Sequence, residues 1–413
     1  MSTILRNRMR KSFLTIAILF VTCAMTSMAQ VTAIKEDFDR LGFRGYDDSE
    51  MILLPSGAEK FRVMIDDIRS AQTYIHAEYY KWWNDSIGRA LLDAMAERAR
   101  QGVAVRVMYD AFGNSGKAPR VTKEFVQHYC DQGIDMVGFD PMRFPYINHA
   151  LHRMHRKMVV IDGTRVYTGG MNVADYYIHG REEIGAWRDM HALLTGSIAK
   201  GYNDLFVQLW EQETRRSLPD IETSSVSPVS SAAAYIVDRK PGRDSRNIRL
   251  AYISCLDRAQ SRVRILNPYI ILVSSVRKAL RRAIERGVEV ELMCSLKGDG
   301  VASQNSTARE VYNLQRRGAT VWLCKDGFHH DKIMIVDDSL CSVGTANLDA
   351  RSLAFDYEVN AYFFSPQYAR QLNAYYDEEI KKSVRLTSAN WTTLYTRKER
   401  RIGWWLKGIR GIL

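Results

Sequence analysis

Two short segments of the sequence carry a histidine, a lysine and an aspartate at the same spacing. The two sets are His155, Lys157 and Asp162, and His330, Lys332 and Asp337. An imidazole can act as a nucleophile or as a general acid or base, and a lysine can stabilise negative charge on a phosphate. Two such sets in one chain predict phosphodiester chemistry.

The spacing within each set separates its members. Side chains alternate between the two faces of a strand, so each histidine shares a face with the lysine two positions later. The aspartate follows its histidine by seven positions and falls on the other face of a regular strand. We therefore expect Asp162 and Asp337 to have a structural role, such as holding a turn in place. Carboxylates that orient the histidines must come from elsewhere, and Asp189 and Glu358 occupy matching downstream positions.

Each set is followed by a glycine-containing segment that ends in an asparagine, Asn172 or Asn347. Glycine lets the backbone approach a ligand closely, and an amide can donate to a phosphate oxygen. If both sets meet, one neutral histidine can attack phosphorus and form a phosphohistidine while the other, protonated, donates to the leaving alkoxide. Because the lysines and amides supply the charge stabilisation, we expect neither a metal nor a cofactor.

An internal duplication positions the two sets. Residues 69–78 are echoed at 257–266, and each copy leads into a helical pattern, a glycine and an alternating β-branched strand, at 86–109 and 275–294. These βαβ patterns predict an α/β protein with two similar domains, each with a mixed, mostly parallel sheet flanked by helices and related by a pseudo-twofold axis. Neither half-site is complete alone.

Composition shifts predict the domain boundaries. The first domain is expected at 30–218, a Ser- and Pro-containing linker at 219–232, the second domain at 233–390 and a basic amphipathic segment at 391–413. With its tryptophans and arginines, the last segment suits an anionic membrane surface. The alternative is a terminal helix docked on its own domain.

Residues 1–29 combine a basic cluster at 6–11, an apolar run at 13–25 and small residues at 27–29. This order is typical of a signal peptide or an uncleaved membrane anchor. We therefore expect an exported protein that is periplasmic, or faces the periplasm at the inner membrane. The formal net charge of +11 suits an anionic partner, which can be lipid or nucleic acid.

The two HxKx₄D motifs, each followed by G-(G/T)-x-N, resemble the phospholipase D superfamily. Segments 87–94, 105–110, 187–189 and 347–352 are similar to the bacterial cardiolipin synthases. The resemblance implies two α/β/α sandwiches, catalytic roles for all six motif residues, and transfer of a phosphatidyl group between two phosphatidylglycerol molecules to give cardiolipin. It favours His155 as the nucleophile. The family's usual pair of amino-terminal spans is reduced here to one signal-like segment.

Two other activities use the same motifs. A phospholipase D passes the phosphatidyl group to water, and a superfamily nuclease cleaves nucleic acid. We expect phosphatidylglycerol and a membrane surface as partners, with no obligate nucleic acid or protein partner. The extra histidines His149, His152 and His329 are expected to be rim or structural residues. The acidic neighbour Asp331 suits His330 as proton donor, and the basic neighbour Arg156 suits His155 as neutral attacker, but both neighbours should face away.

Overall fold

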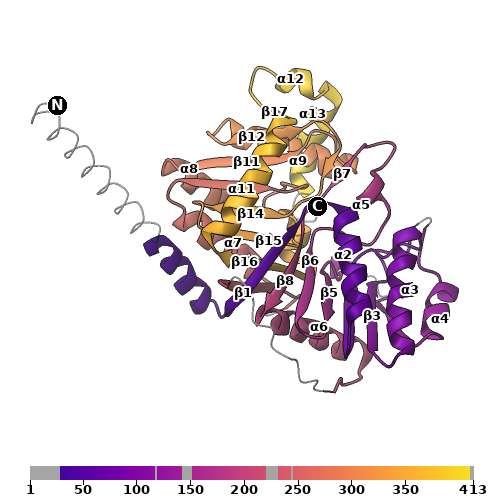
Figure 1. The fold of residues 1–413 in the computed structure, drawn as a ribbon. Helices are drawn as coiled ribbons and strands as arrows, with labels where there is room; N and C mark the ends of the chain where they lie inside the picture. The colour runs from indigo at the N-terminus through magenta and orange to yellow at the C-terminus, as the bar shows by residue number, and fades with distance from the viewer. Residues whose placement is uncertain (1–27, 117–118, 142–150, 220–230, 243–244, 410–413) are drawn as a thin grey trace, which may run out of the picture.

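The computed structural model describes residues 28–116, 119–141, 151–219, 231–242 and 245–409 of the chain (Figure 1). The predicted amino-terminal segment, up to residue 27, and most of the predicted linker lie outside these residues. No helix among the described residues is long and apolar enough to cross a membrane.

The strands of the first half come before the predicted linker and are mostly short and buried. They are β1 (Arg44–Leu54), β2 (Tyr74–Tyr79), β3 (Ala104–Asp110), β4 (Ile134–Phe139), β5 (Lys157–Ile161), β6 (Arg165–Gly169), β7 (Trp187–Arg188) and β8 (His191–Gly196). Its helices are α2 (Gly57–Ser70), α3 (Ser86–Arg100), α4 (Lys123–Cys130), α5 (Tyr176–His179) and α6 (Ile198–Thr214).

The second half repeats this order after the linker. Its strands are β9 (Ala232–Arg239), β10 (Arg262–Leu266), β11 (Glu289–Ser295), β12 (Thr320–Cys324), β13 (Phe328–His329), β14 (Ile333–Val336), β15 (Leu340–Gly344), β16 (Glu358–Phe364) and β17 (Ser383–Arg385). Its helices are α7 (Asn247–Arg258), α8 (Ser274–Glu285), α9 (Val301–Gln315), α10 (Ala350–Ala354), α11 (Pro366–Lys381), α12 (Trp391–Leu394) and α13 (Arg397–Trp405), followed by the 3₁₀ turn η2 (Leu406–Ile409).

The two halves share one sheet of 15 strands. Outward from the antiparallel pair β1 and β9, the first half runs β8-β6-β5-β2-β3-β4 and the second runs β16-β15-β14-β10-β11-β12-β17. The strands match one for one up to β4 and β12. Equivalent strands that pair antiparallel at the centre define the pseudo-twofold axis that the duplication predicts.

The sense of strand pairing corrects one expectation. Only β2-β3-β4 and β10-β11-β12 pair in parallel, while the other neighbours in the large sheet pair antiparallel. The βαβ units seen in the sequence are therefore real, but they cover only the outer part of each half. The strands that follow each histidine are joined by tight turns, and a tight turn can only connect antiparallel strands.

Helices cover both faces of the sheet and make an α/β/α sandwich. One core lies beneath α2 and α3, a second beneath α7, α8 and α9, and a third runs under α6 and α11 across both halves. The third core is continuous because the central strands of the two halves pair with each other. The predicted pair of sandwich domains is thus fused along the middle of the sheet.

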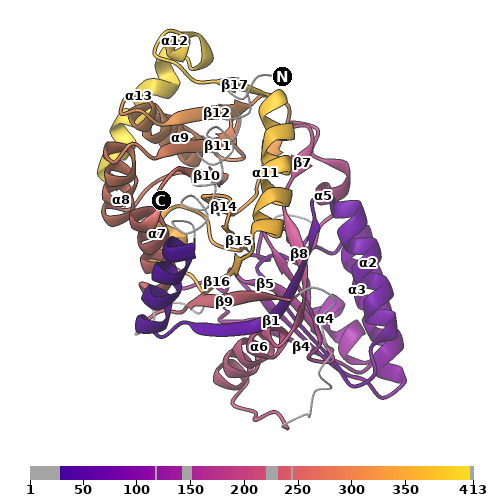
Figure 2. The same ribbon diagram turned by 60° about the vertical axis from the view of Figure 1, so that its left-hand side comes forward.

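The helix at 28–40 belongs spatially to the second half, although the expected first domain begins at residue 30. It lies beside α7 (Figure 2), where Asp37 accepts hydrogen bonds from Ser254 and Arg258. Phe38 is buried and packs edge-on against Tyr362 at 5.2 Å. The apolar surface of the second half decides this position, and periodicity in the sequence carries no information about it.

Candidate active site

Each histidine is held by the backbone of the opposite half. The N–H of His155, just before β5, donates to the carbonyl oxygen of Tyr357 at 3.0 Å. The N–H of His330, after β13, donates to the carbonyl oxygen of Arg188 at 2.7 Å. These contacts belong to two equivalent short parallel pairings, the β7–β13 pair and the Met154–Tyr357 bridge. The two half-sites therefore meet where the halves cross.

The same crossing pairs each imidazole with a carboxylate. Nδ1 of His155 lies 2.7 Å from Oε1 of Glu358, and Nδ1 of His330 lies 2.7 Å from Oδ2 of Asp189. Glu358 starts β16 and Asp189 follows β7, so each carboxylate comes from the half that does not supply its histidine. With Nδ1–H donated to the carboxylate, the lone pair of each ring lies on Nε2.

Both lysines are buried beside their histidines. The Nζ of Lys157 donates to the carbonyl oxygen of His155, and the Nζ of Lys332 donates to that of His330. Burial, aided by Lys332, lowers the pKa of Lys157 to about 7, although Glu358 opposes the shift. Burial also lowers the pKa of Lys332. Burial thus destabilises the charged form of each lysine, and a bound anion would stabilise that form.

Burial and neighbouring cations keep both histidines neutral. Burial is the largest cause of the lowered pKa of His155 and of His330, followed by the charges of Lys157 and Lys332. Burial raises the pKa of Glu358 to about 7 and raises that of Asp189 strongly. An anionic phosphate would favour the protonated form of one imidazole, because it offsets the surrounding positive charge.

The two carboxylates are held differently. Glu358 also accepts from the hydroxyl of Thr345, whereas His330 is the one side chain among the described residues that is seen to hydrogen-bond Asp189. Gly170, at the position matching Thr345, leaves room for Asp189, since a Cβ there would lie 2.0 Å from Oδ1. The G-(G/T) difference between the motifs therefore sets how each carboxylate is supported.

The asparagines lie at the site but are not equivalent. Asn172 accepts from the backbone N–H of Lys81 at 3.2 Å and donates to the hydroxyl of Tyr177 at 3.1 Å. Asn172 therefore braces the segment that follows β2. Oδ1 of Asn347 is buried and has no partner among the described residues, and a phosphate oxygen would accept from Nδ2 of the same amide.

Asp162 and Asp337 lie at the far ends of β5 and β14, away from the histidines. Each follows its strand with positive φ, 51° for Asp162 and 48° for Asp337. Asp162 accepts from the backbone N–H groups of residues 72–74, and Asp337 from those of residues 260–262. Burial opposes ionisation of Asp162, but these hydrogen bonds outweigh it and lower its pKa. This geometry is that of a turn anchor.

Aromatic rings enclose the two histidines unequally. The ring of Tyr80 lies 4.9 Å from that of His155. His330 lies within 6.4 Å of four rings, those of Tyr177, Trp187, Tyr269 and Phe328. Strand patterns predicted neither set, because the rings come from loops, short helices and short strands of both halves.

Two further cations were missed by motif analysis. Lys81, the second residue after β2, and Arg351, in α10, are among the charges that lower the pKa of His155. Burial lowers the pKa of Lys81 itself. Lys81 follows a buried strand at the edge where the outer parallel strands of the half end, which is the signal that could have identified it.

The additional histidines that the structure describes, His152 and His329, lie outside the pair of half-sites. His149 is outside the described residues, and His152 stacks on Phe355 with the ring centroids 6.5 Å apart. His329 is buried, with Nδ1 2.8 Å from Asp331 and Nε2 3.0 Å from Glu379. Among the described residues, the one group with metal-ligand spacing is Cys324, His329 and Glu379. Both nitrogens of His329 already contact carboxylates there.

The residues that follow the two histidines face away from the site. Arg156 contacts Glu78 at 3.0 Å, and Asp331 accepts from the hydroxyl of Tyr375 as well as contacting His329. Neither makes a contact with the adjacent catalytic candidate. The charges next in sequence therefore do not distinguish His155 from His330.

The duplicated sandwich, with one His–Lys pair from each half and crossed His–carboxylate pairs, defines a phospholipase D-like protein. The family model described as "Cardiolipin synthase, PLD-like domain" matches residues 64–210 and 252–381, and the chain belongs to this family. The chain is 36% identical over 341 residues to the probable cardiolipin synthase YwiE of Bacillus subtilis, covering 82% of this chain and 67% of YwiE. It is 33% identical over 346 residues to the major cardiolipin synthase ClsA of the same species, covering 83% of this chain and 71% of ClsA.

A solved structure has the same fold. The phosphatidylserine synthase of Haemophilus influenzae superposes with a TM-score of 0.72 at 17% identity, covering 92% of this chain and all of the other. The polyphosphate kinase of Porphyromonas gingivalis superposes with a TM-score of 0.55, covering 88% of this chain and 53% of the kinase. At these identities the likeness concerns the fold alone.

Proposed function

We propose that this protein is a phosphatidyltransferase that makes cardiolipin and glycerol from two molecules of phosphatidylglycerol through a phosphohistidine. The observation that carries the proposal is the crossed pairing of His155 with Glu358 and of His330 with Asp189 in one buried site. Two imidazoles with oriented Nε2 atoms supply a nucleophile and an acid–base group. The similarity to named cardiolipin synthases supports the substrate.

The reaction has two displacements at phosphorus. Nε2 of one histidine attacks the phosphodiester, the bond to the glycerol head group breaks, and the second histidine protonates the departing alkoxide. The glycerol hydroxyl of another phosphatidylglycerol then gives its proton to that second histidine and attacks phosphorus. The phosphorus–nitrogen bond breaks, which releases cardiolipin and restores the first histidine.

We assign the nucleophile to His155 and the proton donor to His330. Among the described residues, the Asp189 carboxylate has His330 as its side-chain hydrogen-bond partner, while Glu358 is shared between His155 and the hydroxyl of Thr345. A carboxylate with fewer donors stabilises a neighbouring imidazolium more strongly, which suits His330 for carrying the proton. Lys157, Lys332 and Asn347 would bind the non-bridging oxygens.

We also propose that the protein works outside the cytoplasm, at the surface of the inner membrane. The basic and apolar pattern of residues 1–29 supports export, and the basic carboxyl-terminal segment supports contact with anionic lipid. Expression of the full chain with a carboxyl-terminal reporter that folds only in the periplasm tests this location. A signal confined to the cytoplasm would contradict it.

The decisive test is incubation of purified protein with phosphatidylglycerol vesicles, with the products identified by mass. Cardiolipin and glycerol in equal amounts are expected. Phosphatidic acid in place of cardiolipin would identify a phospholipase D, and an unchanged lipid would overturn the proposal. Acid-labile label from substrate carrying phosphorus-32 is expected on the peptide that contains His155. Label on the peptide with His330 would reverse the two roles.

A further inference from the structure

The last described helix, α13, is docked on α9. It begins with a capping box in which Thr396 accepts from the N–H of Glu399 and the Glu399 carboxylate accepts from the N–H of Thr396. Gly403 lets it approach, since a Cβ there would lie 2.4 Å from the carbonyl oxygen of Asn305. The sequence left two alternatives for this segment, a membrane-binding helix or a helix docked on its own domain. Docking on α9 accounts for one face of α13 and leaves the other face to be explained.

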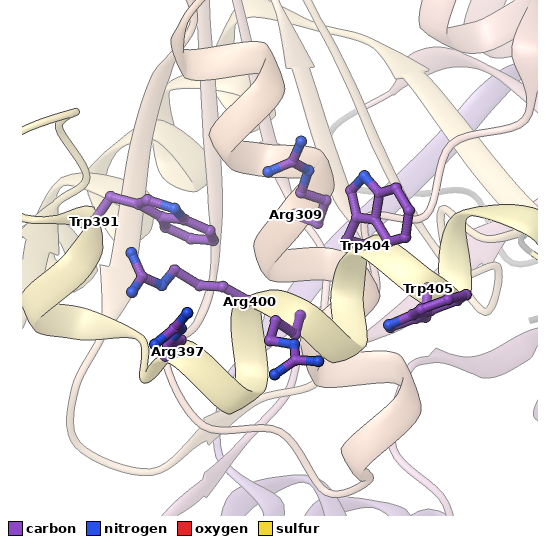
Figure 3. Close-up of a pocket in the computed structure, with 7 residues that line it drawn as sticks. Arg309, Trp391, Arg397, Arg400, Trp404 and Trp405 are labelled. Atoms are coloured by element: carbon purple, nitrogen blue, oxygen red, sulfur yellow. The ribbon is translucent and has the colours of Figure 1, made fainter.

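The other face of α13 borders a pocket of about 490 Å³ between α9, α12 and α13 (Figure 3). Arginines and tryptophans alone line it: Arg309, Trp391, Arg397, Arg400, Arg401, Trp404 and Trp405. Figure 3 shows Arg400 extending from α13 toward Trp391. A pocket with four guanidinium groups and no acidic lining residue selects an anion.

These guanidinium groups have no acidic partner among the residues that the structure describes. None of the ion pairs among the described residues includes Arg309, Arg397, Arg400 or Arg401, and Nε of Arg400 is buried without a partner there. The acid of α13, Glu399, is used in the capping box. Arg277 of the neighbouring helix α8, by contrast, is paired with Glu310 at 2.5 Å. An external anion would supply the missing charge.

Two tryptophans project beside the arginines. Trp404 is 56% exposed and Trp405 is 71% exposed, and their rings meet edge to face at 5.1 Å. Trp391, in contrast, is buried and stacked on Tyr312 at 4.3 Å. Indole rings next to arginines are typical of proteins that enter the interface of an anionic bilayer.

The exposed tryptophans lie toward the active-site end of α9. The start of α13 is near Trp391, which stacks on Tyr312 late in α9. Gly403, near the end of α13, lies against Asn305 early in α9. The two helices therefore run antiparallel. Val301, the first residue of α9, is 68% exposed. Just before it, Asp299 accepts from the hydroxyl of Tyr269, whose ring lies 6.3 Å from that of His330.

We propose that this arginine–tryptophan surface, made of Arg309, Arg397, Arg400, Arg401, Trp404 and Trp405, docks the protein on an anionic phospholipid bilayer. This docking proposal rests on the proposed function, because the bilayer that the surface binds also holds the phosphatidylglycerol substrate. The arginines bind head-group phosphates and the indoles enter the interface. Because the exposed tryptophans lie toward the start of α9, and Asp299 just before it contacts Tyr269 beside His330, docking through this surface would bring the active-site end of α9 toward the lipid.

Nucleic acid is the other anion that arginines commonly bind. The exposed indoles and Val301 favour the bilayer, since large apolar side chains gain free energy when they leave water for the lipid interface. Vesicles therefore serve as the probe, and an oligonucleotide serves as the competing ligand.

The test uses the full chain and vesicles of phosphatidylglycerol or of phosphatidylcholine, with lipids carrying brominated acyl chains. Bromine should quench part of the tryptophan fluorescence of the wild-type protein with phosphatidylglycerol, and Trp404→Ala with Trp405→Ala should remove that quenched part. Arg397→Glu, Arg400→Glu and Arg401→Glu together should lower partitioning on the order of 100-fold. Because bromine quenches only tryptophans that enter the lipid, the quenching reports contact by Trp404 and Trp405 even when the amino-terminal segment also binds the vesicle.

Matched controls change exposed residues elsewhere. Leu41→Ala with Ile52→Ala, and Lys278→Glu with Arg281→Glu in α8, should leave quenching and partitioning unchanged. Equal quenching in the tryptophan variant and the wild type would overturn the proposal. Equal partitioning on both lipids, or an oligonucleotide bound in place of vesicles, would do so as well.

The experiments distinguish a failure of the docking proposal from a failure of the proposed reaction. His155→Ala should bind vesicles as the wild type does, and the tryptophan variant should keep its turnover on phosphatidylglycerol dispersed in detergent while losing at least tenfold on vesicles. A wild-type protein that docks but forms no cardiolipin would refute the proposed reaction and leave the docking surface standing. A tryptophan variant with wild-type turnover on vesicles would refute the docking surface alone.

Discussion

Nδ1 of His155, in the first half of the chain, lies 2.7 Å from Oε1 of Glu358, in the second half. The equivalent pair, His330 and Asp189, crosses in the opposite direction at the same distance. Each half therefore holds one imidazole of its own and orients the imidazole of the other. A single half has no oriented histidine, so both halves must be folded together before any chemistry can occur.

Loss of either imidazole should stop the reaction. His155→Ala and His330→Ala are each expected to lower turnover by about 10⁴-fold or more, because one removes the nucleophile and the other the acid–base group. His179→Ala, at an exposed site in α5, is the control. Turnover is measured as cardiolipin formed from phosphatidylglycerol. Near-normal turnover in either histidine variant would rule out a shared site.

Removing the charge of either crossed carboxylate, Glu358 or Asp189, should lower kcat. Glu358→Gln and Asp189→Asn keep the volume of each side chain but no longer hold the Nδ1–H tautomer, so kcat should fall by about 10²- to 10⁴-fold with little change in KM. Asp66→Asn, at a side chain that is 61% exposed, is the control. A rise in KM at constant kcat would show instead that these carboxylates serve substrate binding.

Lys157 should govern the alkaline side of the pH profile. Its pKa is lowered to about 7, mainly by burial, so in the free enzyme the cation is present below that pH and is lost above it. The ratio kcat/KM should therefore fall as pH rises above about 7, whereas kcat should hold to higher pH because bound phosphate stabilises the cation. Lys157→Arg should remove this decline, and a variant that kept it would assign the limb to another group.

Asp162 should contribute stability without taking part in the reaction. Asp162→Asn is expected to lower the free energy of unfolding by about 1–3 kcal/mol in urea titrations, because the carboxylate accepts three backbone N–H groups. The folded pKa is lowered, so this stability is present above the unfolded pKa and disappears as pH falls through the folded one. Turnover per folded molecule should change less than twofold. A folded but inactive variant would restore a direct catalytic role.

Chelation should leave the activity intact. The phosphate site is built from Lys157, Lys332 and amides, so saturating EDTA is expected to change turnover by less than twofold. Cys324→Ser, in the group with His329 and Glu379, extends the test to the place where metal-ligand spacing occurs among the described residues. Activity that EDTA removes and Mg²⁺ or Zn²⁺ restores would contradict the metal-free mechanism.

The local pattern of the sequence predicted much of the molecule. Strand alternation predicted that His155 and Lys157 share one face and that Asp162 faces away from them, because backbone geometry alone sets that periodicity. The duplication predicted the pseudo-twofold axis, and matching positions identified Asp189 and Glu358 as orienting candidates. These features repeat within each half, so a comparison of the two copies is enough to find them.

Only the tertiary structure decided what joins the halves. The pairing of β1 with β9 fuses the two sheets, and the crossing of His155 to Glu358 and of His330 to Asp189 depends on that pairing. Sequence periodicity describes which face of an element is apolar, but contacts between segments roughly 140–200 residues apart are selected by packing of whole surfaces. The position of the exposed Trp405 near the active-site edge was likewise decided by where α13 packs on α9.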